Sequence, residues 1–305
     1  MLKPLSKTID AGFSMSTSCQ TILVETPKLP LEEIERSLTK TYRKDIFRPF
    51  VQAINAYELV EPGDKIAIGI SGGKDSLLMA KLFQELKRHN KIPFEIVFLS
   101  MNPGFRDVNL ELLETNCKYL EIPLTIRNSD VFSVVQKIAS ENPCYMCARM
   151  RRGFLYNAAK ELGCNKLALG HHFDDVIETT LLNVFYNGTF KTMVPKIKAE
   201  NFEDIELIRP MMFIKEKDII RWTVKSGIQA MNCGCTVVAE KTSSKRREIK
   251  EMINSLRKVN PNIDAHIFNA GQNVNLEAIL GYQKGEEKVH FNTLYRERNP
   301  KPSKE

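Results

Sequence analysis

Short apolar runs alternate with longer amphipathic segments along most of the chain. A short run of β-branched and other apolar residues predicts a buried strand, and a segment of about 10 to 15 residues with apolar positions three or four apart predicts a helix. Strands are predicted at 66–70, 94–100, 123–129, 166–170 and 206–210, and helices at 77–89, 108–120, 174–186 and 215–227. This alternation is typical of an α/β fold whose parallel sheet is flanked by helices.

Helical patterns also lie on either side of this central part. Residues 31–59 carry apolar side chains at helical spacing with many charges between them. We therefore expect four parts: a flexible extension at 1–30, an N-terminal helical segment at 31–62, an α/β domain at 63–230 and a basic helical C-terminal region at 231–305.

The composition is that of an ordinary globular protein, since 43% of the 305 residues are hydrophobic and 27% are charged. No apolar run approaches the roughly 20 residues that span a bilayer. The N-terminal stretch lacks the apolar core of a secretory signal. We therefore expect a cytoplasmic protein without a membrane partner.

The net charge of +7 is unevenly distributed. Residues 241–305 contain 13 Lys and Arg against 8 Asp and Glu. Such an excess suits a polyanionic partner, because each neutralised phosphate releases counterions. A solvated basic surface without a ligand would have the same composition, so charge alone leaves both interpretations open.

The stretch SGGKDS, residues 71–76, connects the first predicted strand to a helix. Gly72 and Gly73 permit a tight turn and a close approach of backbone N–H groups to an anion. The N-terminus of the following helix favours negative charge there. The side chains that add a positive charge or a hydroxyl donor are Ser71, Lys74 and Ser76. This chemistry suits a pyrophosphate, against the alternative of a glycine-rich turn that binds nothing.

The stretch is not a Walker A loop. That motif needs glycine where this chain has Ile68, and Ser or Thr after the lysine, where it has Asp75. Two further polar stretches follow predicted strands, SMNPGF at 100–105 and GHHFDD at 170–175. Open parallel sheets bind ligands beyond the carboxyl ends of their strands, so all three stretches are candidates for one site.

The chain has seven cysteines, of which four are closely spaced. Cys144 and Cys147 form a C-x-x-C motif, and Cys233 and Cys235 form a C-x-C motif. Such motifs are found in redox pairs, zinc sites and iron–sulfur sites, and the spacing does not choose among them. The remaining cysteines are Cys19, Cys117 and Cys164. The last two lie in or beside apolar helix faces, where a cysteine is expected to be a small buried residue.

These motifs together resemble a known family. SGGKDS resembles the PP-loop of the ATP pyrophosphatases, and GHHFDDVIETTLLN is similar to the second signature of their tRNA-modifying branch. Residues 40–285 resemble the tRNA 2-thiocytidine synthetase family, TtcA, which combines a PP-loop, a central C-x-x-C and one later cysteine. The stretches NGTFKTMVPKI, LIRPMMFIKEKDI and KRREIKEMINSLRKVNP carry the resemblance further.

The resemblance implies three cofactors: ATP, Mg²⁺ and a 4Fe–4S cluster. The implied cluster ligands are Cys144, Cys147 and Cys235, with Cys233 in reserve. The reserve is needed because the family usually has a second C-x-x-C where this chain has C-x-C.

The resemblance also implies roles for individual residues. The implied nucleotide-binding residues are Ser71, Gly72, Gly73, Lys74, Asp75, Ser76, Ser100, Met101, Gly170 and His171. The implied catalytic residues are Asp75, Asp174, Asp175 and Arg151. Among these, Asp75 is a candidate for holding Mg²⁺, and the pair Asp174–Asp175 for orienting Mg²⁺ or moving a proton. His172, Met211, Met212 and Trp222 are interpreted as packing residues.

The implied reaction is the ATP-dependent adenylation of a tRNA cytidine, at position 32 of the anticodon loop, followed by exchange of its 2-oxygen for sulfur. The implied partners are tRNA and a sulfur donor such as a cysteine desulfurase or sulfide, and a homodimer is compatible with the family. We expect Lys245, Arg246 and Lys250 of the basic C-terminal helix to contact tRNA phosphates.

Two alternatives remain. One is a PP-loop thiolase that acts on a tRNA uridine, like the TtuA enzymes, although those carry paired zinc motifs at both ends and this chain has none. The other is a non-enzymatic, nucleotide-dependent tRNA-binding protein with a structural zinc, which would not need SGGKDS and GHHFDD together.

Overall fold

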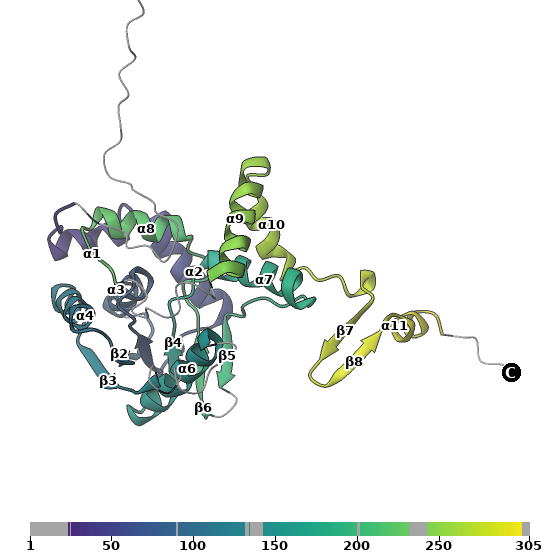
Figure 1. Cartoon of the computed structure of the whole chain (residues 1–305), viewed down its shortest axis with the longest axis horizontal. Helices are drawn as coiled ribbons and strands as arrows, with labels where there is room; N and C mark the ends of the chain where they lie inside the picture. The colour runs from purple at the N-terminus through teal and green to yellow at the C-terminus, as the bar shows by residue number, and fades with distance from the viewer. Residues whose placement is uncertain are drawn as a thin grey trace, which may run out of the picture.

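The computed structural model describes residues 24, 26–89, 91–131, 134, 143–199, 202–231 and 243–300. The centre of its body is a six-stranded sheet (Figure 1). The strands are β1 (Lys65–Gly69), β2 (Glu95–Asn102), β3 (Leu124–Asn128), β4 (Lys166–Ala168), β5 (Lys196–Ala199) and β6 (Phe202–Ile208). Their order is β3-β2-β1-β4-β6-β5, and every neighbouring pair is parallel except β5 with β6. The predicted α/β fold is confirmed.

Strand β5 is the one strand of this sheet that the sequence pattern does not predict. Its sequence, KIKA, is short and half of it is lysine, which is typical of an exposed edge strand. The predicted strand at 206–210 corresponds to the end of β6, which begins earlier, at Phe202.

Strand β1 shows why helices cover both faces of the sheet. Its side chains alternate between two hydrophobic clusters, as the period of two in a strand requires. Ile66 and Ile68 pack with α3 (Lys74–Arg88), whereas Ala67 packs on the opposite face with α6 (Pro143–Glu161). A strand buried on both faces is apolar throughout, which is why IAIGI was recognisable in the sequence.

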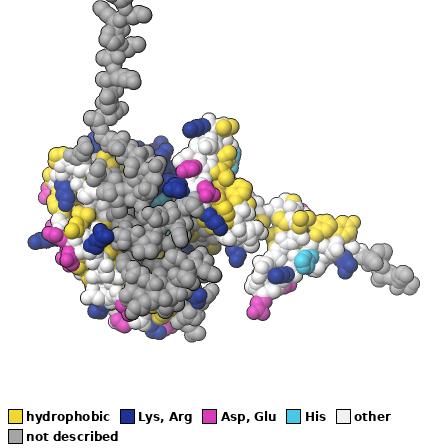
Figure 2. Space-filling model, in the orientation of Figure 1, with side chains coloured by type: hydrophobic (Ala, Val, Ile, Leu, Met, Phe, Trp, Pro, Cys, Tyr) yellow, Lys and Arg dark blue, Asp and Glu magenta, His cyan; other side chains and the backbone are white. Residues whose placement is uncertain are grey.

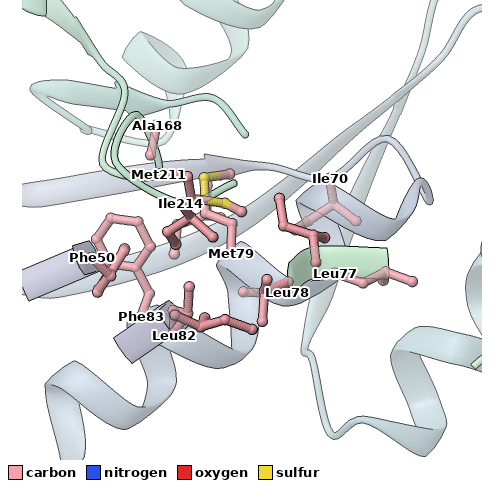
Figure 3. Packing of buried hydrophobic residues seen from close by; sticks show 14 of the residues in the cluster. Phe50, Ile70, Leu77, Leu78, Met79, Leu82, Phe83, Ala168, Met211 and Ile214 are labelled. Carbon is pink, nitrogen blue, oxygen red and sulfur yellow. The ribbon is translucent and has the colours of Figure 1, made fainter. Parts of the chain in front are cut away.

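The larger cluster extends from α3 to the N-terminal helices. Those helices are α1 (Leu31–Thr39), the π-helix η1 (Arg43–Phe47) and α2 (Arg48–Tyr57), and the same cluster includes residues of α4 (Asp107–Tyr119) and α8 (Glu216–Lys225). Figure 3 shows Phe50, Phe83, Met211 and Ile214 in this cluster. The rings of Phe50 and Phe83 meet edge to face at 5.4 Å. Met211, Met212 and Trp222 are buried here, so their interpretation as packing residues is confirmed.

A separate cluster joins α7 (Phe173–Asn187) to two C-terminal helices, α9 (Ser243–Val259) and α10 (Ile263–Ala270). Beyond them the chain forms η2 (Leu276–Ala278), strands β7 (Gly281–Lys284) and β8 (Glu287–His290), and α11 (Phe291–Arg298). This hairpin and helix stand away from the body (Figure 1), and hydrophobic side chains are visible on them (Figure 2). The hairpin is not predicted by the sequence pattern. Gly285, at φ +62°, forms its turn.

Among the described residues, no helix is long and apolar enough to cross a membrane.

Candidate active site

The strand order of the sheet reverses beside β1, because the chain continues to β2 and β3 on one side and to β4 and β6 on the other. Open α/β sheets bind ligands at such a switch point, beyond the carboxyl ends of the strands. The loops that follow β1 and β4 meet there. A Cβ added to Gly170 would lie 3.3 Å from the backbone carbonyl carbon of Asp75, a tight contact, so glycine favours the close approach of the two loops.

The SGGKDS loop has a conformation that requires Gly72. Its φ is +80°, a region that other residues rarely adopt. A Cβ at this position would lie 2.3 Å from Sδ of Met231, whose N–H donates a hydrogen bond of 2.9 Å to the Gly72 carbonyl. The loop is therefore held between the end of β1 and the segment after α8.

Hydroxyl groups close the same loop onto the first turn of α3. The Ser76 hydroxyl donates to the Gly73 carbonyl at 2.9 Å and accepts from the Ser71 N–H at 3.1 Å. Helix α3 begins directly after Gly73, so its free N–H groups and its positive dipole end belong to this loop. The arrangement suits a phosphate anion.

Lys74 places a cation at the start of α3. Its Nζ lies 3.1 Å from Oδ2 of Asp75 and 3.4 Å from Oε1 of Glu216. Burial lowers the pKa of Lys74, but these two carboxylates outweigh it and raise the pKa above its usual value. Glu216 also pairs with Lys250 at 2.6 Å. Its own pKa falls to about 2 because, against the opposing effect of burial, the charges of Lys74 and Lys250 favour the carboxylate.

Asp75 has one free carboxylate oxygen. Oδ2 is paired with Lys74, whereas Oδ1 is buried and has no hydrogen-bond partner among the described residues. A buried carboxylate oxygen without a donor is costly, and a hard cation such as Mg²⁺ would satisfy it. Asp75 therefore fits the role of magnesium ligand that the sequence suggested.

Asp174 does not have this freedom. Its Oδ1 accepts a hydrogen bond of 2.7 Å from Nη2 of Arg257, and its Oδ2 accepts one of 2.7 Å from the backbone N–H of Glu216. The side chain is 10% exposed. Asp174 thus ties the first turn of α7 to α8 and α9, and neither oxygen is open to a metal ion.

Asp175 is engaged in the same way. Its Oδ2 accepts from the His172 N–H at 2.9 Å, which caps α7, and its Oδ1 accepts from Arg246 at 2.6 Å. Burial raises the pKa of Asp175, but the positive charges of His172 and Arg246 more than offset this, and the net shift is downward. Both acids of the pair are engaged by neighbouring helices and act as positioning groups, which disfavours the expected Mg²⁺ role for them.

The basic helix α9 supplies the partners of these acids. Arg246 binds Glu178 at 2.8 Å as well as Asp175, and Lys250 binds Glu216. Lys245 lies over the Tyr186 ring at 5.1 Å. The expectation that all three cations are available for tRNA phosphates is therefore corrected for Arg246 and Lys250, because both are held by carboxylates of the site.

Two histidines follow β4. Burial, with the nearby positive charges of Arg209 and Arg246, lowers the pKa of His171 to about 4 against the opposing charge of Asp175. His171 is therefore neutral near neutral pH. His172 is 6% exposed and lies between two acids, with Nε2 3.8 Å from Oδ1 of Asp75 and Nδ1 3.6 Å from Oδ2 of Asp175. His172 is buried, as the interpretation as a packing residue expects, but it also lies beside two carboxylates of the site.

Arg209 is a site residue that the sequence analysis did not single out. It follows β6 and is 8% exposed, and its side chain makes one hydrogen bond to a described residue, from Nη1 to the Val194 carbonyl at 2.6 Å. Within the described part of the chain, Nε has no hydrogen-bond partner and no carboxylate forms an ion pair with the guanidinium. Burial lowers the pKa of Arg209 to about 10, so it remains charged at neutral pH. The sequence signal was an arginine directly after a predicted strand, in LIRP.

Unpaired buried polar atoms gather at this edge of the sheet. Seven such side-chain atoms occur among the described residues, and five belong to residues near the ends of β1, β2, β4 and β6. The five are Asp75 Oδ1, Ser100 Oγ, His171 Nδ1, His172 Nδ1 and Arg209 Nε. Buried polar groups are nearly always hydrogen-bonded in proteins, so this concentration indicates a place that a polar ligand completes. Hereafter these atoms are called the unpaired set.

The remaining predicted residues lie around this edge or outside the described side chains. Ser100 and Met101 are buried in β2. Arg151 lies on α6 and has no ion-pair partner among the described residues. Cys144 and Cys147 belong to the first turns of α6, but their side chains are outside the description, as are Cys233 and Cys235 altogether. Cys117 and Cys164 are buried free cysteines, as predicted.

Residues 32–232 match the PP-loop domain family. A tRNA-cytidine(32) 2-sulfurtransferase of Syntrophotalea carbinolica is 36% identical over 233 residues, covering 75% of this chain and 88% of the relative. A protein of the same name from Neisseria meningitidis serogroup C is 38% identical over 227 residues, covering 73% of this chain and 69% of the relative. Sequence and geometry together define a PP-loop protein.

The U34-tRNA thiolase NcsA from Methanococcus maripaludis, solved with its 4Fe–4S cluster, has a similar fold. The TM-score is 0.63 at 23% identity, over 81% of this chain and 86% of that chain. Within the PP-loop class, the chain belongs to the tRNA 2-thiocytidine synthetase family, TtcA, as the relatives at 36% and 38% identity establish. The family predicted from the sequence is confirmed, and with it the enzyme class, the tRNA sulfurtransferases.

Proposed function

We propose that this protein uses ATP to adenylate a cytidine at position 32 of the tRNA anticodon loop and then replaces its 2-oxygen with sulfur. The observation that carries the proposal is the unpaired set at the carboxyl ends of four parallel strands. It combines a carboxylate oxygen and a guanidinium N–H that make no hydrogen bond to a described residue with two imidazole groups beside a helix N-terminus. A nucleotide with a bound divalent cation satisfies groups of each kind.

The phosphate groups have distinct partners in this proposal. The SGGKDS loop and Lys74 hold the pyrophosphate part of ATP, and Asp75 Oδ1 would hold Mg²⁺, which would neutralise phosphate charge when bound. Arg209 faces the α-phosphate, where negative charge increases during adenylation, and Arg151 acts on the same group from α6. His171 can hydrogen-bond to phosphate without adding charge, because it is neutral. The adenine lies beside Ser100 and Met101, and Gly170 leaves room for the nucleotide. Fixed charges of this kind accelerate a reaction by positioning and by charge stabilisation.

The reaction has two displacements. The cytosine 2-oxygen attacks the α-phosphorus, and the bond to the bridging oxygen breaks so that pyrophosphate leaves with the electron pair. Sulfide then attacks carbon 2, and the carbon–oxygen bond breaks so that AMP leaves with the former cytosine oxygen. Cys144, Cys147 and Cys235, with Cys233 as the alternative third ligand, would hold a 4Fe–4S cluster that would present the sulfide. Free sulfide would replenish it directly, and a cysteine desulfurase would do so together with a thiol that supplies two electrons.

The decisive test is mass spectrometry of tRNA nucleosides from cells with and without the gene. We expect loss of 2-thiocytidine at position 32 in the deletion strain and its return with the wild-type gene. Loss of a thiouridine with unchanged 2-thiocytidine would show that the substrate base is a tRNA uridine and refute the cytidine assignment. Unchanged thionucleosides together with a colourless, zinc-containing protein would favour the non-enzymatic alternative.

A further inference from the structure

A groove of about 960 Å³ lies outside the active site, between the N-terminal helices and the end of α3. Its floor is apolar and includes Phe47, Val51 and Ile92, all partly buried. Its basic side chains are Lys40, Arg43, Lys44, Arg48 and Lys91, and all five are exposed. No Asp or Glu is among its lining residues. We call this feature the N-terminal groove.

The five cations of the N-terminal groove are unpaired. None of them forms an ion pair with any residue that the structure describes, whereas nearby acids are already engaged. Asp45, within the same π-helix, faces away to Arg221 at 2.7 Å, and Glu35 binds Lys81 and Arg88. An acid-free line of exposed cations produces a positive potential that an anionic partner would satisfy.

The cations form a continuous line because of helical spacing. Positions 43, 44, 47, 48 and 51 recur every three or four residues, so they share one face through the π-helix and into α2, and Lys40 lies in the turn just before them. Single π-turns within helices are often found at functional sites. The face offers its cations to successive phosphates of one RNA strand.

The N-terminal groove is separate from the nucleotide site. The SGGKDS loop runs into the first turn of α3, whereas the groove lies at its last turn and beyond, near His89 and Lys91. A helix of 15 residues is about 22 Å long. A folded tRNA with one base in the active site extends well beyond this distance, so one RNA can reach both places.

We propose that the N-terminal groove binds an unpaired stretch of the substrate tRNA, an inference that rests on the proposed function. Its phosphates lie on the rim cations and a base lies against the floor, where the Phe47 and His89 rings are 5.5 Å apart. Basic grooves with aromatic surfaces are typical of single-stranded nucleic-acid sites. A protein partner is less suited, because the line of cations offers only one sign of charge. The groove also provides free cations, unlike Arg246 and Lys250 of α9.

The test compares two triple variants of equal charge change in the full-length protein. The groove variant carries Arg43→Gln, Lys44→Gln and Arg48→Gln. The control variant carries Lys118→Gln, Lys198→Gln and Lys284→Gln, three exposed lysines outside the groove that have no ion pairs among the described residues. Fluorescence anisotropy measures the affinity of each protein for labelled tRNA between 50 and 200 mM salt. Binding of an ATP analogue, which neither variant should alter, checks that the active site is intact.

We expect the groove variant to lower the slope of log affinity against log salt by roughly two to three, since each lost phosphate contact removes about 0.7 to 0.9. Near 0.1 M salt this corresponds to about 100-fold weaker binding. Equal effects of the two triples would overturn the inference while leaving the proposed function intact. Wild-type protein that binds no tRNA would overturn both. Unchanged tRNA affinity with loss of thiolation in cells would assign the groove to a protein partner and refute the RNA assignment.

Discussion

The conformation of the SGGKDS loop can be tested by giving Gly72 a methyl group. Gly72→Ala places a Cβ at a φ of +80° and 2.3 Å from Sδ of Met231. The positive φ costs about 1 to 2 kcal/mol for a non-glycine residue. Overpacking adds about 1 to 3 kcal/mol, towards the lower end because the Met231 side chain can move. The expected loss of stability is therefore about 2 to 5 kcal/mol.

Gly63 offers a matched control. Its φ is +87°, and an added Cβ would have no heavy atom within 4 Å. Gly63→Ala therefore measures the conformational cost alone, about 1 to 2 kcal/mol. Thermal unfolding should show a decrease in Tm of about 2 to 4 °C for Gly63→Ala and about 4 to 10 °C for Gly72→Ala, since 1 kcal/mol shifts Tm by about 2 °C in a chain of this size.

A double-mutant cycle isolates the steric part. Met231→Ala removes the atom that the new Cβ would meet, so the combined variant should recover about 1 to 3 kcal/mol relative to the sum of the single variants. AMP formation should fall in Gly72→Ala and stay normal in Gly63→Ala. Equal losses of stability in the two glycine variants, together with no coupling between positions 72 and 231, would refute the steric contact with Met231. Normal AMP formation by Gly72→Ala would remove this loop from the phosphate site.

Three further predictions concern charged groups of the site. Asp75→Asn should abolish AMP formation in a radiolabelled-ATP assay and lower Tm only slightly, because Lys74 loses its pair with Oδ2 but keeps Glu216, and Oδ1 makes no hydrogen bond to a described residue; normal AMP formation would contradict this. Because the pKa of His171 is about 4 in the folded chain and 6.5 in the unfolded one, the unfolded chain binds more protons between these values, so stability falls as the pH falls through this window. In urea titrations at several pH values, His171→Asn should reduce the change of unfolding free energy with pH. A variant with the same pH dependence as the wild type would refute this prediction. Glu216→Gln should lower the free energy of unfolding by about 2 kcal/mol at pH 7, since Lys74 and Lys250 lose a shared carboxylate. An unchanged free energy in urea unfolding would show that the lysines find other partners.

Local features of this site could be predicted from the sequence. The strand 66–70, the glycines after it and the helix beginning near Lys74 are contiguous, so their spacing alone carries the information. The same holds for GHHFDD at the end of β4. Because parallel strands bring their carboxyl ends to one edge, the two loops could be placed side by side before the structure was available.

Long-range pairings could not be predicted in this way. Arg246 and Asp175 are 71 positions apart, and Arg257 and Asp174 are 83 apart. The sequence of a basic helix does not tell whether its cations face RNA or buried carboxylates. The packing of α9 on α7 determines which of the two they face. Arg209 could not be singled out from the sequence either. What distinguishes it is that it has no carboxylate partner among the described residues, and a sequence does not show which charges remain unpaired.

The attachment of α9 to the GHHFDD segment has a consequence for how this enzyme can be divided. The match to the PP-loop domain ends at residue 232, yet the arginines that hold Asp174 and Asp175 lie beyond it. A fragment or chimera cut at that boundary would retain both acids and lose their counter-charges, which leaves two carboxylates in the first turn of α7 to repel each other. The segment that matches the family is therefore shorter than the segment that must be moved in a domain exchange. Helix α9 has to accompany the PP-loop domain.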